Sequence, residues 1–411
     1  MFNAKVRWPE YAELAGLFFL QSMAMGMWMV PLGRVLSAHG FAEIRAQAFA
    51  TSAVAALLSP LVFGAVADRH VAPVRVLRWL AAASAAGMAL ATFGISRAWA
   101  SWVVLILIQG YALCAAPTGS IASSIVFARL SDSQRQFGPI RAVATVGWMS
   151  GCWMISALGA DSSPLAGYSG AVAWLGLAGF TFLVPSVLPA PSLGVATWRE
   201  HLGWDALALL KNPNHRVVFF TVALFNIPLA AFYPFAPQHL KQLGFDHTSA
   251  WMTLGQVTEV IAMFALAGLF ASLRLKWILA AGLMVGVLRY TLCAINQPIC
   301  VLAGVTLHGL SFTLVFVTAQ IYLNERVSPE WRARAQALMW LMSGGVGNLV
   351  GYLGSGFWLQ ASTRSDDTLW TQFWGGLAVV MVLVLAYFMM AYHAQGGGLR
   401  RRALSPGAAQ S

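Results

Sequence analysis

Two polar side chains lie deep inside an apolar run, where reversible proton binding or hydrogen bonding would justify their cost. Glu259 lies about eleven residues into the run 248–271, and Gln256 comes three residues before it, so both share one helix face. A charged residue at the centre of a bilayer costs about 2.5 to 3.5 kcal/mol. A carboxyl group there can hold a proton at neutral pH, because burial disfavours the charged form. The alternative is a structural hydrogen bond between helices.

A cation, a hydroxyl group and an aromatic ring form a second group. Arg141, Thr145 and Trp148 are spaced i, i+4 and i+7, so a helix would place them along one face. An arginine keeps its charge, so in an apolar segment its side chain must face a cavity, a carboxylate or a lipid headgroup. Glu259 would be a suitable partner. The alternative is that Arg141 extends to the nearby membrane surface along its apolar stem.

A histidine and a phenylalanine form a third group. His308 and Phe312 are spaced i and i+4, and Thr313 follows directly. A histidine inside an apolar segment can be a neutral hydrogen-bonding group or a proton relay, and the sequence supports both interpretations equally. Arg289, in the outer part of the preceding run, is interpreted as a structural or surface-reaching residue.

Composition indicates which elements position these groups. Of 411 residues, 59% are hydrophobic and 9% are charged, whereas a soluble globular chain carries about 25% charged residues. So few charges cannot cover the surface of a soluble protein of this size. A disordered chain is excluded as well, because disorder requires low hydrophobicity. The sequence therefore predicts an all-α membrane protein. Apolar runs long enough to cross a hydrocarbon core about 30 Å thick span residues 14–36, 46–67, 75–94, 99–127, 139–159, 168–188, 217–240, 248–271, 276–295, 299–323, 335–358 and 369–393.

The basic residues indicate how these twelve runs cross the membrane. The chain has 25 Lys and Arg residues and a net charge of +11. Twelve crossings place both termini on one side, where 18 of the basic residues fall, against five on the other side. Cytoplasmic loops carry the excess of Lys and Arg, so both termini are predicted in the cytoplasm, with the protein in the inner membrane. Topology explains the basic surplus, and we expect no nucleic-acid partner.

The chain divides into two halves. A segment rich in Pro and charge separates six apolar runs from six, and a loop pattern after the second run recurs weakly after the eighth at an offset of 204 residues. Parallel halves around a central site are the plan of many secondary transporters. We expect a six-helix bundle at 1–188, a cytoplasmic linker at 189–216, a second six-helix bundle at 217–395 and a flexible cytoplasmic tail at 396–411.

The loop after the second run resembles the signature loop of the major facilitator superfamily. It reads Gly64-x-x-x-Asp68-Arg69. In that superfamily the glycine allows close helix approach, and the Asp and Arg form a charge network that latches one conformation. The resemblance implies this conformational role for Gly64, Asp68 and Arg69. The match is partial, because residues 70–73 replace the glycine and basic residues expected next.

A narrower resemblance covers much of the chain. Several co-linear segments are similar to the nucleoside:H⁺ symporter family of the same superfamily, and their joint match is more specific than any one segment. The fold implied is two six-helix halves, and the activity implied is proton-coupled nucleoside transport. The matching segments are residues 116–118, 137–148, 251–259, 287–290, 308–312 and 325–336.

The resemblance implies roles for residues already singled out. The family's nucleoside-binding Arg and Thr, with an aromatic residue one turn on, fall on Arg141, Thr145 and Trp148. The family's Gln-x-x-Glu falls on Gln256 and Glu259, and the Glu is implicated in substrate binding and proton coupling.

The tenth and seventh runs depart from the family pattern. The family's aromatic residue falls on Phe312, but His308 replaces a Tyr and Thr313 replaces an Asp. The family's seventh helix offers amides to the substrate, whereas residues 227–232 contain none and only Asn226 is near. We expect substrate contacts from His308, Phe312 and Thr313, and proton coupling by Glu259 with His308 as the substitute for the missing Asp.

Together, these observations and the resemblance predict a twelve-helix transporter that takes up nucleosides with protons by alternating access. We expect a monomer in the lipid bilayer, with a nucleoside as its small-molecule partner and no cofactor beyond the proton as coupling ion. No metal-spaced His/Cys cluster, phosphate-binding glycine loop or exposed nucleophile is evident in the sequence, so we expect no enzyme. The alternatives are a transporter of a sugar or other small molecule, in either direction, and a receptor that binds its ligand without moving it.

Overall fold

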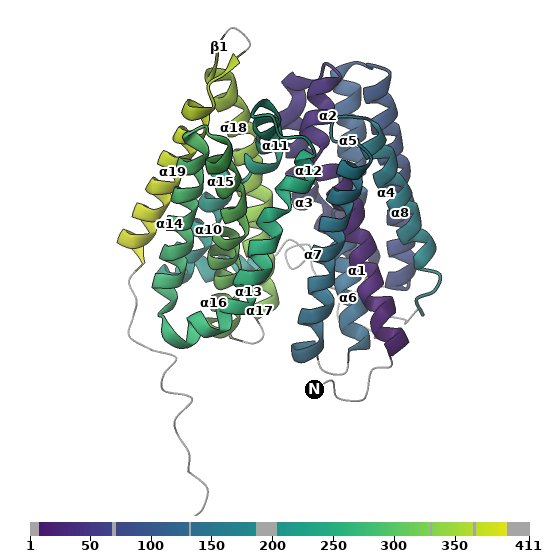
Figure 1. Ribbon diagram of the computed structural model, residues 1–411. Helices are drawn as coiled ribbons and strands as arrows, with labels where there is room; N and C mark the ends of the chain where they lie inside the picture. Colours follow the sequence, from purple (N-terminus) through teal and green to yellow (C-terminus); the bar gives the residue numbers. More distant parts are fainter. Residues whose placement is uncertain are drawn as a thin grey trace, which may run out of the picture.

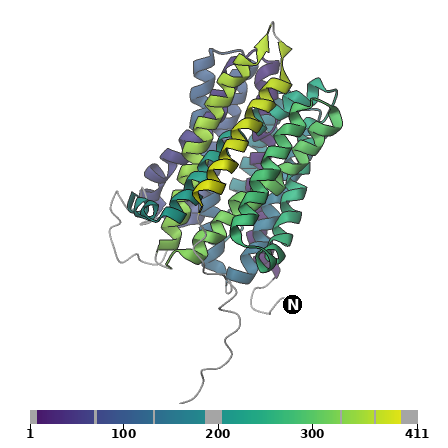
Figure 2. The same ribbon diagram turned by 90° about the vertical axis from the view of Figure 1, so that its left-hand side faces the viewer.

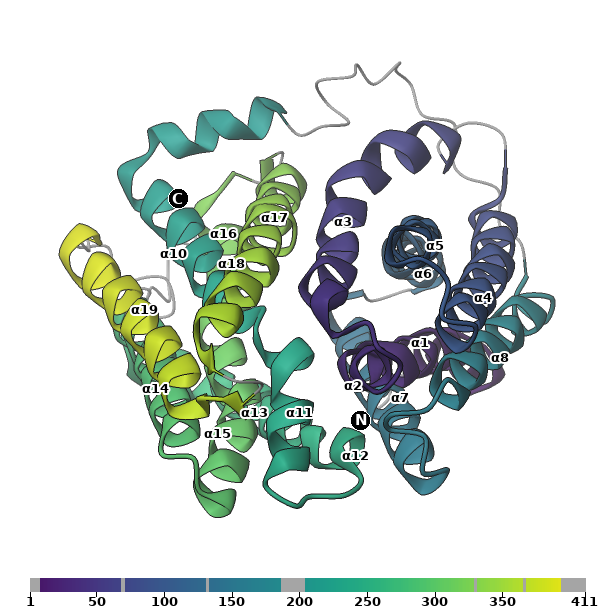
Figure 3. The same ribbon diagram turned by 90° about the horizontal axis from the view of Figure 1, so that it is seen from above.

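A computed structural model describes residues 8–67, 71–130, 133–185, 204–328, 331–364 and 367–392. Within these ranges the chain is helical apart from turns and one short hairpin, as the predicted all-α class requires. Figure 1 shows the helices as two groups that stand side by side, and Figure 3 shows the same two groups from above. The helix that begins the chain starts at the lower end of Figure 1, and we use "lower end" and "upper end" in that sense.

The first group of helices comes from the N-terminal half of the chain, and we call it the N half. Its elements are α1 (Trp8–Met29), α2 (Leu32–Ala38), η1 (Ala42–Ile44), α3 (Arg45–Ala67), α4 (Pro73–Ser96), α5 (Ser101–Ala115), α6 (Thr118–Arg129), α7 (Ser133–Ala157) and α8 (Leu165–Phe180).

The second group, the C half, contains two π-helical segments, η3 and η5, and the hairpin β1–β2, which extends beyond the helices at the upper end (Figure 2). The hairpin is antiparallel and pairs Thr363 with Thr368. The elements are η2 (Trp204–Lys211), α10 (Pro213–Leu229), α11 (Phe232–Gln242), α12 (Thr248–Met252), α13 (Leu254–Ser272), α14 (Leu275–Ala294), α15 (Pro298–Phe312), η3 (Thr313–Val317), α16 (Thr318–Arg326), α17 (Arg332–Trp340), η5 (Leu341–Gly347), α18 (Asn348–Ala361), β1 (Thr363–Arg364), β2 (Asp367–Thr368) and α19 (Trp370–Ala391).

Local sequence explains where several helices begin. Pro73, Pro213 and Pro298 occupy the first turn of α4, α10 and α15, where the missing N–H costs nothing and the fixed φ suits a helix. The side chain of Asn212 accepts hydrogen bonds from the amides of residues 214 and 215 and caps α10. Helix α10 therefore starts at Pro213, four residues before the predicted apolar run at 217.

Eight segments among the described residues are long and apolar enough to cross a membrane. Helices extend beyond the predicted apolar runs at some ends: α1 begins at Trp8 and α7 at Ser133, against predicted starts at 14 and 139. The reason is physical, because a helix continues into polar turns outside the hydrocarbon. The eight segments are Glu10–Ala38, Pro73–Ser96, Ser101–Arg129, Pro213–Gln242, Thr248–Leu266, Leu275–Ala294, Pro298–Arg326 and Trp370–Ala391.

Each half has its own apolar core. One cluster of buried side chains draws mainly on residues 14–184 and the other mainly on residues 206–392. The first includes Trp28, whose ring packs edge to face on Tyr111 with centroids 5.9 Å apart. The second includes the buried rings of Phe373 and Trp374, 4.8 Å apart. Each half therefore has its own packed interior, to which the other half adds a few side chains, such as Tyr352 in the first cluster and Cys152 in the second.

The two halves approach each other closely at the upper end. At Gly33 of α2, an added Cβ would lie 2.6 Å from the carbonyl oxygen of Pro234 in α11. At Gly356 of α18, an added Cβ would overlap the side chain of Ala46 in α3. Only glycine permits the halves to pack this closely, so the contact at the upper end requires glycine at these two positions.

Candidate functional site

An arginine and a glutamate from opposite halves lie within electrostatic reach of each other. Arg141 lies on α7 of the N half and Glu259 on α13 of the C half. The two charges interact electrostatically, although no ion pair within 4 Å joins these two described residues. Arg141 is exposed and Glu259 is half-buried. The predicted partnership is therefore present as a long-range interaction across the boundary between the halves.

The ring of Trp148 reaches across the same boundary two turns further along α7. Its centroid lies 5.7 Å from that of Tyr233 on α11, with an interplanar angle of 56°. The indole N–H of Trp148 is buried and has no hydrogen-bond partner among the described residues. A buried donor without an acceptor is costly, so this N–H is available to a bound ligand.

Gln256 is held by the same tyrosine. Its side-chain amide donates a 3.0 Å hydrogen bond to the hydroxyl oxygen of Tyr233, and only 5% of Gln256 is exposed. Tyr233 also lies within electrostatic reach of Glu259. One tyrosine therefore joins the aromatic residue of the N half to the Gln and Glu of the C half.

His308 is enclosed by aromatic rings and an arginine. Its ring stacks on Phe232 with centroids 4.0 Å apart and an angle of 14°. The guanidinium of Arg289 lies 2.9 Å from Nδ1 of His308 and 4.7 Å above the centroids of Phe232 and Tyr290. Arginine can only donate, so Nδ1 accepts this bond and the imidazole is neutral in this arrangement.

Arg289 is buried and structural. Only 1% of its surface is exposed, so the surface-reaching interpretation does not apply, and its hydrogen bond to His308 and its contacts with aromatic rings compensate its charge in the C half. Helical spacing does not indicate this pairing, because residues 289 and 308 lie on different helices.

Phe312 continues a column of rings toward the lower end. It stacks with His308 at 6.4 Å and with Phe316 at 5.0 Å, and Phe316 packs edge to face on Trp340 at 4.8 Å. The π-helical segment η3 begins directly after Phe312. Such segments are frequent at functional sites, because the extra residue in the turn reorients side chains.

Thr313 faces a neighbouring backbone. It is fully buried, and its hydroxyl donates a 3.5 Å hydrogen bond to the carbonyl oxygen of Glu259. One turn earlier, an added Cβ at Gly309 would overlap the backbone of Gly255 and Glu259. Helices α13 and α15 are therefore in close contact beside Glu259. Thr145, in contrast, is half-buried on the same stripe of α7 as Arg141.

Sequence reasoning missed Tyr233. The family pattern predicts amides in the seventh run, but the nearest, Asn226, is 5% exposed and donates to the carbonyl oxygen of Val222 in its own helix. The helix is interrupted at residues 230 and 231, between α10 and α11, so helical spacing counted along α10 does not predict which way Tyr233 faces. The useful signal was Pro228 inside the helix, because a proline interrupts helical hydrogen bonding.

The predicted conformational latch is only partly within the described residues. Gly64 lies inside α3, in its last turn. Asp68 and Arg69 lie outside the described residues, so their contribution stays a prediction. In the described ranges no group of three or more His, Cys, Asp or Glu side chains is arranged to hold a metal ion.

Comparisons with known proteins agree on one family. The sequence model of the family described as nucleoside H⁺ symporter matches residues 11–396. The chain is 33% identical over 404 residues to the proposed nucleoside transporter YegT of Escherichia coli, with 93% of each protein covered. It is 26% identical over 403 residues to the nucleoside permease NupG of Escherichia coli, with 92% of this chain and 94% of NupG covered.

Solved structures show the same fold. A crystal structure of a variant of the nucleoside transporter NupG matches with a TM-score of 0.84 at 24% identity, covering 93% of this chain and 100% of that one. A bacterial homologue of the lysosomal transporter Spinster, in an inward-facing conformation, matches with a TM-score of 0.71 at 13% identity, covering 95% and 96%. The architecture is therefore that of a helical membrane transporter.

Proposed function

The chain belongs to the nucleoside H⁺ symporter family, a family of transporters and not of enzymes, and we propose that it takes up nucleosides together with protons by alternating access. The observation that carries this proposal is the interaction of Arg141 with Glu259 across the boundary between the halves. A charge pair shared by two moving halves can respond to both a proton and a substrate. The rings and amide that surround it suit a flat, polar ligand.

Twelve membrane crossings account best for the helix order. The eight apolar segments are joined by four further crossings, formed by α3, α7, α8 and the continuous stretch from α17 to α18. Residues 1–188 and 217–395 then form two six-helix halves around the site, linked by 189–216 and followed by the tail 396–411. The excess of Lys and Arg on that side indicates that the lower end and both termini lie in the cytoplasm. The membrane of this proposal is the inner membrane.

Glu259 is the proton-coupling residue of this proposal. With a proton, its carboxyl group is neutral and releases Arg141, and without one it attracts the cation from the opposite half. The bilayer makes an unpaired charge costly, so the protonation state of Glu259 biases the relative position of the halves. Thr313 leaves no second acid at the position where the family has an Asp, and a single carboxyl group then carries the coupling.

His308 has a positioning role. Protonation at Nδ1 would break its hydrogen bond to Arg289 and place two cations together, which the buried surroundings disfavour. Through its stacking on Phe232, neutral His308 fixes the start of α11 and with it Tyr233. The sequence predicts that His308 carries a proton in place of the missing Asp. We propose instead that Glu259 alone couples transport to protons.

The substrate contacts follow from the unpaired groups. Trp148, Tyr233 and Phe312 offer ring faces to the base, and the free indole N–H of Trp148 suits a base carbonyl. Gln256 and Thr145 supply polar groups for its edges. The hydroxyl oxygen of Tyr233 accepts a hydrogen bond from Gln256. The hydroxyl hydrogen of Tyr233 can therefore be donated to the substrate. The protein acts as a monomer in the bilayer, with the proton as its coupling ion and no further cofactor.

Counterflow tests this proposal. Proteoliposomes containing the protein are loaded with unlabelled uridine, and the entry of external labelled uridine is followed. We expect a transient accumulation of label, abolished when the internal load is glucose. Counterflow of labelled glucose into glucose-loaded proteoliposomes, with no counterflow of labelled uridine, would replace the proposal by a sugar transporter. Saturable uridine binding without counterflow would replace it by a receptor.

A further inference from the structure

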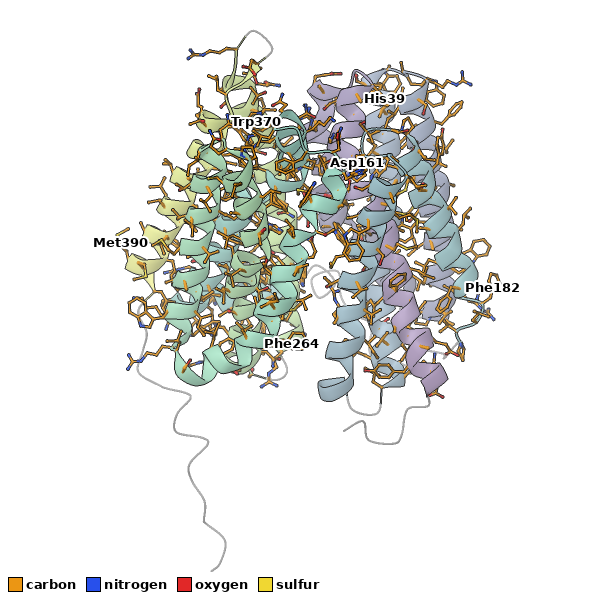
Figure 4. All side chains as sticks on the ribbon, viewed as in Figure 1. His39, Asp161, Phe182, Phe264, Trp370 and Met390 are labelled. Carbon is orange, nitrogen blue, oxygen red and sulfur yellow. The ribbon has the colours of Figure 1, made fainter. Side chains whose placement is uncertain are left out.

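A carboxylate of the N half holds the start of a C-half helix at the upper end. Asp161 follows α7 and is 5% exposed. Its Oδ1 atom accepts a 2.6 Å hydrogen bond from the amide of Ser249 and a 3.3 Å hydrogen bond from the hydroxyl of Thr248, both in α12. Figure 4 shows Asp161 at the upper end, where the two halves meet. A buried acid in a loop of one half is thus bonded to the other half.

Ser156, in the last turn of α7, strengthens the same contact. Its hydroxyl donates to Oδ1 of Asp161 at 3.2 Å and accepts from the amide of Ala250 at 3.0 Å. Its carbonyl oxygen lies 2.9 Å from Nδ1 of His247. The end of α7 therefore bonds to two polar groups at the start of α12, the amide of Ala250 and the ring of His247.

A cation of the N half completes the arrangement. Arg34 of α2 is largely buried and donates a 2.9 Å hydrogen bond to the hydroxyl of Thr248, which is fully buried. Arg34 and Asp161 also interact electrostatically with each other. Thr248 thus lies between an anion and a cation that both belong to the N half. If α12 withdraws, those two charges remain together and neither is left without a partner.

We propose that Asp161 is a gating residue. Its bonds to Thr248 and Ser249 hold closed the contact between the halves at the upper end, which we call the upper gate. This inference rests on the alternating access of the proposed function, which requires the upper contact to open in each cycle. Hydrogen bonds to an ionised acceptor are roughly twice as strong as those between neutral groups, so the carboxylate contributes more than its neutral neighbours. Arg34 provides the alternative partner that makes the contact reversible.

Distance measurements between the halves test the gate without any substrate. Spin labels are placed at the exposed positions Arg97 and Gln297, in loops of the N half and the C half at the upper end, after replacing the native cysteines. The distance distribution is measured for the parent, Asp161→Ala and Asp161→Asn. The matched control is Asp367→Asn, since Asp367 is exposed and lies in the hairpin of the C half, away from α12.

We expect the parent to populate mainly the short distance. Loss of hydrogen bonds to a charged acceptor should raise the ratio of long to short distances about tenfold in Asp161→Ala, with a smaller rise in Asp161→Asn and none in the control. An unchanged distribution in Asp161→Ala would overturn the proposal. If Asp161→Ala does not fold, Thr248→Val tests the same contact from the C half, and an unchanged distribution there would overturn it too. Because no nucleoside is present, a shifted gate without uridine transport would reject the proposed function and keep the gate.

Discussion

Trp148 of α7 packs against Tyr233 of α11 with ring centroids 5.7 Å apart, so the two halves of the chain meet through these rings at the candidate site. Tyr233 also accepts the hydrogen bond of Gln256. A movement of one half relative to the other must therefore change this ring contact, and a bound base could replace it. Tyr233 is the residue through which the substrate groups of the two halves are connected.

Replacing the hydroxyl of Tyr233 should weaken nucleoside binding. Tyr233→Phe keeps the ring but leaves the buried amide of Gln256 without its acceptor. A neutral hydrogen bond contributes about 0.5 to 1.5 kcal/mol, so we expect the KM for uridine uptake to rise up to about tenfold. Initial uptake rates over a range of uridine concentrations measure this change. Tyr111→Phe, in the core of the N half, is the control, and an equal KM in Tyr233→Phe and the parent would remove Tyr233 from the site.

Gly309 should not tolerate a side chain. The Cβ of Gly309→Ala would overlap the backbone of Gly255 and Glu259, so α13 and α15 would have to separate beside the proton-coupling residue. Overpacking typically costs about 1 to 3 kcal/mol. We expect a lower unfolding temperature and a loss of uptake, measured by thermal unfolding in detergent and by transport. Gly268→Ala, where nothing lies within 4 Å of the added atom, should leave both unchanged, and an equal effect of the two variants would contradict this account of the packing.

His308 should be dispensable as a proton carrier. Asparagine can place its amide oxygen close to the position of Nδ1, so His308→Asn keeps an acceptor for Arg289 but cannot carry a proton near neutral pH. We expect this variant to accumulate uridine against a gradient to the level of the parent. The measurement is uptake driven by an inward proton gradient. Counterflow that persists while accumulation is lost would show instead that His308 takes part in coupling.

Helical spacing predicted the groups within each helix. Gln256 and Glu259 were expected on one face of one helix, and the structure brings that face toward the N half, where Arg141 interacts with Glu259. The electrostatic argument that an arginine in an apolar run needs a carboxylate partner was sufficient to predict this relationship. Periodicity and the cost of burying charge are local properties, so a sequence can reveal them.

Contacts between helices far apart in the chain were beyond the reach of the same reasoning. The bond of Arg289 to His308 and the position of Tyr233 depend on how helices pack and on the break between α10 and α11. Asp161 lies between the apolar runs 139–159 and 168–188, where nothing in the sequence indicates burial, yet it is bonded to a helix 87 residues further along the chain. Hydropathy also located the apolar part of each helix and not its polar ends, which is why α1 begins earlier than predicted.

Proton-driven uptake by the parent and by Glu259→Gln tests the central claim most directly. Labelled uridine is supplied to proteoliposomes with and without an inward proton gradient. The account predicts that the parent accumulates uridine only with the gradient, and that Glu259→Gln exchanges uridine in counterflow but does not accumulate it, because an amide cannot bind and release the coupling proton. Accumulation by Glu259→Gln equal to that of the parent would contradict the account.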